Sequence, residues 1–207
     1  MFSSISKLPL IQNYFTLLVA LIPVSFIAGN LVINLNVFVI IVSSLLVFGK
    51  EIVKIKLILL DKLIFLFFFF IIFSALYNDI YFIANDLYPE DFKTVKKSFL
   101  FLRYLLFYFS IRLVIEKNYF NVKTFFMSSS ICVIFVTLDL CLQFFSGKDI
   151  FGFPKSNFKV SGPFGDELIA GSYLQRFCLF LFFLVPFYKD YFTKINLNFL
   201  LLLIFIL

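Results

Sequence analysis

The stretch LILLDKLIFLFFFFIIFSALY occupies residues 57–77 and contains only two charged side chains, Asp61 and Lys62, both near its start. A helix needs about 20 mainly apolar residues to cross the hydrocarbon core of a bilayer. This stretch has that length and consists mostly of Phe, Leu and Ile. The sequence therefore predicts a membrane-spanning helix at residues 57–77.

Similar apolar stretches lie before and after this one. We expect spanning helices at residues 14–29, 31–49, 98–115, 125–145 and 173–188, and the start of a seventh at residues 196–207. The seventh stretch is too short to cross a bilayer, so we expect the chain to be the N-terminal part of a longer protein. The predicted fold class is all-α: a polytopic transmembrane helical bundle, in which residues 1–207 belong to one membrane domain with six complete spans plus a truncated seventh.

Composition supports a membrane protein and excludes several classes of function. The chain is 62% hydrophobic and 14% charged, whereas a soluble domain is about half apolar and a quarter charged. Its net charge of +6 is explained by Lys and Arg in cytoplasmic loops, so we do not expect nucleic-acid binding. There is no His, and the three Cys form no CxxC pair, so we expect neither a metal site nor thiol–imidazole chemistry in this stretch.

The distribution of basic residues predicts the orientation in the membrane. Clusters of Lys and Arg follow the second span and the fourth span, whereas the connection near Gly29 and Asn30 carries no charge. Cytoplasmic loops carry the excess of Lys and Arg, so we expect a cytoplasmic N-terminus, with outer loops at residues 78–97 and 146–172. Residues 25–28 resemble a secretory cleavage site, but a second apolar segment follows at once and favours an uncleaved first helix.

The loop at residues 146–172 has the most unusual composition in the chain. It contains five of the seven Gly, and its run Gly162-Pro163-Phe164-Gly165 predicts tight turns with positive φ available at either Gly. Asp166 follows and is a candidate N-terminal cap of the next helix. Long loops with such backbone demands often carry function, although an ordinary re-entrant turn remains the alternative interpretation.

Three charged residues are expected at one depth in the membrane. Arg103, Asp139 and Arg176 all fall within roughly 10 Å of the outer ends of their spans, at 1.5 Å per residue. Gln143 stands one helical turn beyond Asp139 and faces the same way. One interpretation is an ion pair that joins neighbouring helices. The other is a site for an anionic headgroup, in which Asp139 orients an arginine.

Other charged residues stand at the opposite ends of their spans. Asp61, Lys62 and Arg112 lie near the expected cytoplasmic ends. We expect their charged groups to snorkel to the interface.

The segments Asp139–Gly152 and Ser161–Ser172 resemble the bacterial O-antigen ligase and O-antigen polymerase-like membrane proteins. In that family an apolar span ends in a polar outer loop, and a basic residue precedes a Ser/Thr-Gly-x-Phe-Gly turn. Lys159 stands where an Arg is common. The resemblance implies a glycosyltransferase of the bacterial inner membrane that acts in lipopolysaccharide and cell-envelope biosynthesis. It would transfer glycan from undecaprenyl diphosphate to lipid A-core or to another lipid-linked repeat, without a metal or cofactor.

The resemblance also implies roles for individual residues. Cationic side chains would bind the pyrophosphate leaving group, and we assign Arg176 and Lys159 to this role first and Arg103 after them. The supporting residues are Asp139, Gln143, Gly162, Gly165 and Glu167. The catalytic base is expected in an outer loop beyond Leu207, and Asp166 is a second candidate for it. A polysaccharide or lipid transporter or flippase is the alternative function, and a non-catalytic scaffold is a third.

Overall fold

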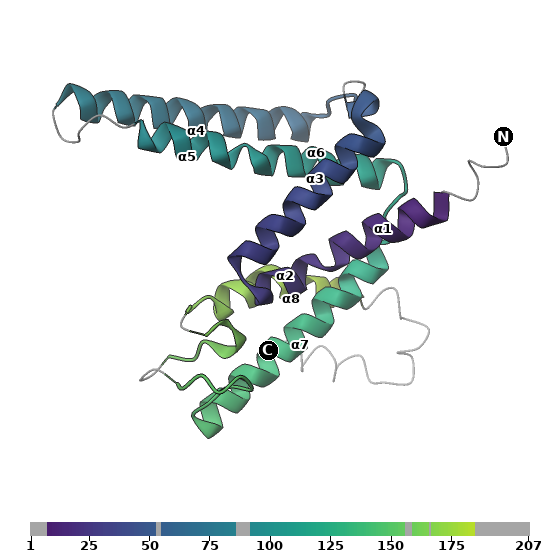
Figure 1. Ribbon diagram of the computed structural model, residues 1–207, viewed down its shortest axis with the longest axis vertical. Helices are drawn as coiled ribbons and strands as arrows, with labels where there is room; N and C mark the ends of the chain where they lie inside the picture. The colour runs from purple at the N-terminus through teal and green to yellow at the C-terminus, as the bar shows by residue number, and fades with distance from the viewer. Residues whose placement is uncertain (1–7, 53–54, 86–91, 156–158, 166, 185–207) are drawn as a thin grey trace. The chain divides into compact units, whose positions relative to one another are not determined.

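The computed structural model describes residues 8–52, 55–85, 92–155, 159–165 and 167–184. Within these ranges the secondary structure is helical, apart from an isolated bridge between Lys148 and Pro154. The helices are α1 (Leu8–Ala20), α2 (Ile22–Ala28), α3 (Asn30–Ile52), α4 (Leu59–Ala84), α5 (Lys93–Phe101), α6 (Arg103–Glu116), α7 (Val122–Ser146), the short 3-10 turn η1 (Gly162–Phe164) and α8 (Ala170–Leu184) (Figure 1). The predicted all-α fold class is therefore confirmed.

Five helical stretches in the described ranges are long and apolar enough to cross a membrane. They are Pro9–Ala28, Asn30–Gly49, Leu59–Ala84, Lys93–Glu116 and Val122–Ser146. By helix length and hydropathy, the chain is a multi-pass membrane protein. The sixth expected span corresponds to α8, whose 15 described residues end at Leu184. The rest of that span and the expected seventh, at residues 196–207, lie outside the described residues.

Helices α4 and α5 extend into the connection that was expected as an outer loop at residues 78–97. Helix α4 continues to Ala84, and α5 already begins at Lys93. A contact between the two helices explains this extension. The buried carboxylate of Asp79 accepts a hydrogen bond of 2.9 Å from the amide of Val95 in the first turn of α5. A carboxylate satisfies the unpaired amides at a helix N-terminus and complements the helix dipole.

Two compact units divide the chain. One combines Met1–Val37 with Asn118–Leu207, and the other is Phe38–Lys117. Helix α3 contributes to both units.

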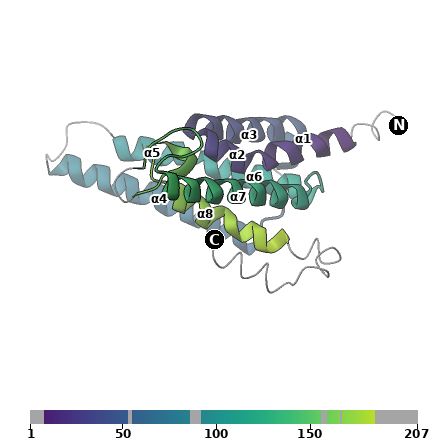
Figure 2. The same ribbon diagram turned by 90° about the horizontal axis from the view of Figure 1, so that it is seen from below.

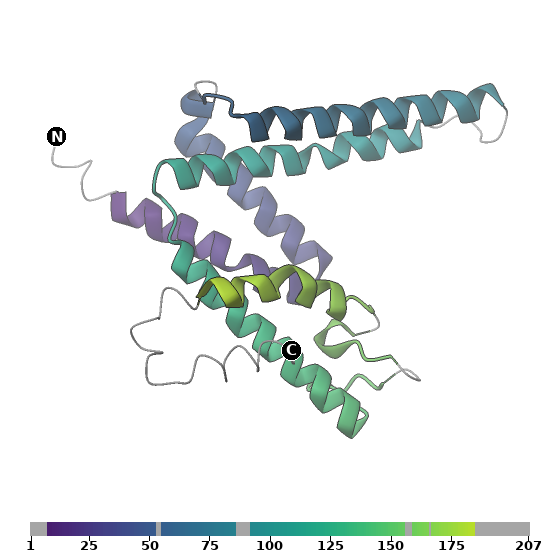
Figure 3. The same cartoon turned by 180° about the vertical axis from the view of Figure 1, so that it is seen from behind.

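In the unit Phe38–Lys117, α4 runs alongside α5 and α6 (Figures 1 and 3). Asp61 in the first turn of α4 is fully buried and forms an ion pair with Arg112 of α6. Its carboxylate also accepts hydrogen bonds of 2.7 Å from the hydroxyl of Tyr108 and from the amide of Ile58. The expectation that Asp61 snorkels to the interface is therefore wrong, whereas the side chain of Arg112 stays partly exposed while it pairs with Asp61.

The physical reason lies in the contacts across these helices. The arginine and the tyrosine hydroxyl neutralise and solvate the carboxylate inside the protein, so it does not need to reach water. Lys62, by contrast, is exposed, as snorkelling predicts.

In the other unit, α7 is the central helix. It packs against α8 on one side and against α1 and α2 on the other (Figure 2). The core consists of buried side chains from α7 and α8, namely Cys132, Val133, Val136, Tyr173 and Phe177. Helix α1 ends at Ala20, and α2 begins at Ile22 with Pro23 in its first turn. The first span is thus interrupted near this proline, which has no amide to donate within a helix.

Candidate functional site

The loop between α7 and α8 is held by Gln143, whose side chain is fully buried. Its amide oxygen accepts hydrogen bonds from the amides of Ser161, at 2.9 Å, and Gly162, at 2.8 Å. Its amide nitrogen donates to the carbonyl of Phe153 at 3.3 Å and to the Ser161 hydroxyl at 3.4 Å. One side chain thus joins the early part of the loop to the turn that precedes α8.

Asp139, one helical turn before Gln143, is also fully buried. Its Oδ1 accepts a hydrogen bond of 2.8 Å from the amide of Ile150, and its Oδ2 has no hydrogen-bond partner in the described structure. Asp139 was expected to orient an arginine. Among the described residues, none of the hydrogen bonds of Asp139 goes to an arginine. Asp139 instead bonds the backbone of the loop, at the Ile150 amide.

The turn at Gly162–Phe164 has the backbone that its sequence predicts. Gly162 has a φ of 58° and Gly165 a φ of 62°, so positive φ occurs at both glycines. Space is also limited at Gly162, because an added Cβ would lie 3.1 Å from the side chain of Leu140 on α7. The predicted cap residue, Asp166, lies outside the described residues.

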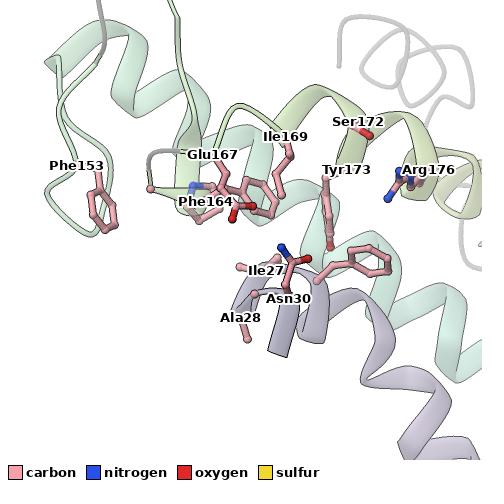
Figure 4. A pocket seen from close by; sticks show the side chains of 14 residues that line it. Ile27, Ala28, Asn30, Phe153, Phe164, Glu167, Ile169, Ser172, Tyr173 and Arg176 are labelled. Carbon is pink, nitrogen blue, oxygen red and sulfur yellow. The ribbon is translucent and has the colours of Figure 1, made fainter. Parts of the chain in front are cut away.

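A cavity of about 430 Å³ opens beside this turn (Figure 4). The end of α2 and the start of α3 form one wall, and the loop and the first turns of α8 form the other. It is lined by Phe26, Ile27, Ala28, Gly29, Asn30, Phe153, Pro163, Phe164, Gly165, Glu167, Ile169, Ser172, Tyr173 and Arg176. All of these residues belong to one compact unit.

The cavity combines one basic and one acidic side chain with aromatic walls. Arg176 and Glu167 are both exposed, and Tyr173 lies between them (Figure 4). The guanidinium carbon of Arg176 stands 5.7 Å from the centre of the Phe26 ring, which suits a cation–π contact. The Tyr173 hydroxyl donates to the Pro23 carbonyl at 3.2 Å and so ties α8 to α2.

The structure separates the predicted site residues into groups. Arg176, Glu167 and Gly165 line the cavity. Asp139 and Gln143 organise the loop behind it, as described above.

Two predicted cations stand elsewhere. Lys159 is exposed on the loop and is not among the residues that line the cavity. Arg103 belongs to the other compact unit, where its guanidinium donates to the Tyr104 hydroxyl at 3.1 Å and its carbon lies 4.9 Å from the Tyr104 ring centre.

Several lining residues were not predicted from the sequence. Asn30, Phe153 and Tyr173 come from three distant parts of the chain and meet only in the folded protein. The sequence did contain one signal of this corner. The uncharged residues Gly29 and Asn30 stand at the junction of the first two predicted spans, which leaves no room for an ordinary loop. Gly29 adopts a φ of 110°, which turns the chain sharply from α2 into α3.

Comparison with protein-family models, with curated proteins and with solved structures finds no match to this chain.

Proposed function

We propose that this protein is a membrane glycosyltransferase of surface polysaccharide assembly, of the O-antigen ligase or polymerase type. It would transfer a glycan from undecaprenyl diphosphate to lipid A-core or to another lipid-linked repeat. The observation that carries the proposal is the cavity beside the glycine-rich turn, in which Arg176 and Glu167 stand among aromatic side chains. The resemblance of the Ser161–Ser172 segment to that family supports the same reaction.

The chemistry of the cavity suits a lipid-linked sugar diphosphate. When the glycan is transferred, negative charge develops on the diphosphate leaving group, and a guanidinium stabilises this charge with paired N–H donors. We assign this role to Arg176. The carboxylate of Glu167 can accept hydrogen bonds from sugar hydroxyls, and the rings of Phe153 and Phe164 offer apolar faces to the sugar or to the isoprenoid.

The loop supplies further positive charge without lining the cavity. Lys159 is exposed, so we assign it the attraction of the anionic donor towards the site rather than a direct contact. In this proposal the protein resides in the bacterial inner membrane with a cytoplasmic N-terminus. The count of Lys and Arg beside the spans supports this orientation, which puts the cavity at the outer face.

The test is Arg176→Ala in the intact protein. The variant is produced in a bacterial strain from which the native gene for this protein has been deleted. Surface glycan is scored on a gel, and the protein level in the membrane by immunoblot. We expect glycan to fall at least about a hundredfold, since a lost charge-stabilising donor costs about 10²–10³ in rate. Arg176→Lys should recover part of the activity because it restores the charge without the paired donors.

Lys62→Ala is the matched control, since this cation is exposed and belongs to the other compact unit. It should leave the glycan unchanged. Normal glycan from Arg176→Ala at a normal protein level would remove the assigned role.

A further inference from the structure

A groove of about 520 Å³ runs between α4 and α5, within the unit Phe38–Lys117. The two helices lie side by side in this unit (Figures 1 and 3). One end of the groove is apolar and is lined by the rings of Phe67, Phe70 and Phe101, which are between 41% and 58% exposed. Both helices belong to stretches that can cross a membrane, so this end of the groove is open to lipid.

Small side chains make the middle of the groove hollow. Ala75 and Ser98 line it there and are buried, and Ser74 of the same lining is also small. The hydroxyl of Ser98 donates to the Val95 carbonyl of its own helix at 2.7 Å, so this hydroxyl needs no partner within the groove. Such a surface suits a hydrocarbon chain, which offers no hydrogen bonds.

The other end of the groove is polar and carries a positive charge. Asn78 of α4 lines it together with Thr94 and Lys97 of α5, and all three side chains are exposed. Their position depends on Asp79, whose buried carboxylate accepts a hydrogen bond from the Val95 amide and so fixes the start of α5 beside α4. The amide of Asn78 and the ammonium of Lys97 can both donate to an anionic oxygen.

The length of the groove matches one leaflet of a bilayer. From Asn78 to Phe67, α4 rises about 16 Å, at 1.5 Å per residue. The hydrocarbon core of a bilayer is about 30 Å thick, so one leaflet contributes about 15 Å. A lipid whose headgroup lies at Lys97 can therefore lay one acyl chain along the groove as far as the Phe67 ring.

The lysines at the start of α5 indicate a negatively charged headgroup. Lys93, Lys96 and Lys97 all lie there. In the orientation proposed above they stand at the outer face, where the excess of Lys and Arg in cytoplasmic loops does not explain them. Within the described ranges, no acidic side chain forms an ion pair with Lys97. Residues 86–91, which include three acids of this connection, lie outside those ranges.

We propose that the groove between α4 and α5 binds an anionic phospholipid of the surrounding bilayer. The phosphate accepts hydrogen bonds from the Lys97 ammonium and the Asn78 amide, and one acyl chain lies over Ala75 and Ser98 between the aromatic rings. The cavity that contains Arg176 belongs to the other compact unit, so the groove is assigned to a bilayer lipid and not to the glycan donor. The lipid site does not depend on the proposed glycosyl transfer.

The test measures lipid binding by the intact chain in detergent with native mass spectrometry. Phosphatidylglycerol and phosphatidylethanolamine with identical acyl chains are added in separate titrations, so that only the headgroup differs. We expect phosphatidylglycerol to bind about fivefold more tightly, since one basic side chain near a membrane favours an anionic lipid by about this factor.

Three variants locate the site. Lys97→Ala removes the cation at the polar end and should bring the two affinities within about twofold of each other. Lys93→Ala is the matched control, because it removes an exposed lysine of the same helix that does not line the groove, and it should keep the preference. Ser74→Phe fills the hollow beside Ala75 and should weaken the binding of both lipids. If Ser74→Phe does not fold, the comparison of the two lysine variants decides the question.

Several results would overturn the proposal. One is equal affinity of the wild type for the two lipids, and another is the same loss of preference in Lys93→Ala as in Lys97→Ala. Unchanged binding by folded Ser74→Phe would show that the acyl chain lies elsewhere. Undecaprenyl phosphate is also added as a competitor of deuterated phosphatidylglycerol. If it displaces this lipid at a lower concentration than unlabelled phosphatidylglycerol does, the groove is a site for the isoprenoid and the phospholipid assignment is wrong.

Discussion

The amide of Gly162 donates a hydrogen bond of 2.8 Å to the side-chain oxygen of Gln143, and this bond joins the glycine-rich turn to the last turns of α7. The contact spans 19 residues of sequence. It explains why the turn forms where it does, because the same oxygen also accepts from Ser161 and is fully buried. The turn shapes the wall of the cavity, so the position of this wall depends on Gln143.

Gln143→Ala should therefore loosen the loop and destabilise the protein. The substitution leaves the amides of Ser161 and Gly162 without their acceptor, and each unpaired buried group costs about 1–3 kcal/mol. We expect the free energy of unfolding in mixed detergent micelles to fall by about 2–4 kcal/mol, with faster proteolysis within the loop. Gln175→Ala, at an exposed position of α8, is the matched control and should change neither. Equal stability of both variants would contradict the assigned role of Gln143.

Gly162→Ala should be destabilising, and Gly171→Ala should not. Gly162 has a φ of 58°, and an added Cβ would stand 3.1 Å from Leu140, so both backbone strain and crowding oppose a side chain. The left-handed conformation alone costs roughly 1–2 kcal/mol. Gly171 is helical, with no atom within 4 Å of an added Cβ, so alanine there should be neutral or stabilising. Thermal unfolding of the two purified variants distinguishes the positions, and a lower midpoint for Gly171→Ala would count against this assignment.

Asp61→Ala should be among the most destabilising substitutions in the unit Phe38–Lys117. It removes the fully buried partner of Arg112 and leaves Nη1 of the guanidinium and the Tyr108 hydroxyl without their acceptor. Breaking a buried ion pair from one side costs about 3–5 kcal/mol.

A double-mutant cycle measures the coupling within this pair. Asp61→Ala combined with Arg112→Leu should lose less stability than the sum of the two single variants, because the second change removes the unpaired charge. Strict additivity would show that the two residues do not interact. Lys62→Ala, which changes an exposed charge on the same helix, should stay within about 0.5 kcal/mol of the wild type.

Tyr173→Phe tests the contact between α8 and α2. The hydroxyl of Tyr173 donates to the carbonyl of Pro23 at 3.2 Å, and its ring packs in the core of the same unit. Loss of the hydrogen bond alone should reduce the free energy of unfolding by about 0.5–1.5 kcal/mol. Tyr173→Ala also removes the ring and should cost about 3–5 kcal/mol, as other large core truncations do. Similar losses for the two variants would show that the ring contributes little to packing.

Much of the fold follows from local properties of the sequence. Five expected spans occur as helices because a bilayer demands long apolar segments, and this demand is visible in each segment by itself. Positive φ at Gly162 and Gly165 was predicted for a similar reason, since a Gly-Pro-Phe-Gly run carries its turn preference within a few residues. The interruption of the first span near Pro23 likewise depends only on the missing amide.

The partners of the charged and polar side chains could not be predicted from such local properties of the sequence. Asp61 was expected to reach water, yet it is buried and pairs with Arg112, which lies 51 residues further along the chain on α6. Asp139 was expected beside an arginine and instead bonds the backbone of the loop. Neither hydropathy nor helical periodicity encodes which side chain of another helix will stand opposite a given residue.

The sequence by itself thus determined that this is an all-α membrane protein, which segments cross, and where the chain turns on glycine. Those properties depend on the free energy of transfer into the bilayer and on local backbone sterics. Only the tertiary structure decided that Gln143 holds the turn at Gly162, and that Arg176 and Glu167 share a cavity with the α2–α3 corner. These arrangements depend on contacts between distant segments, whose energies exist only once the helices have packed.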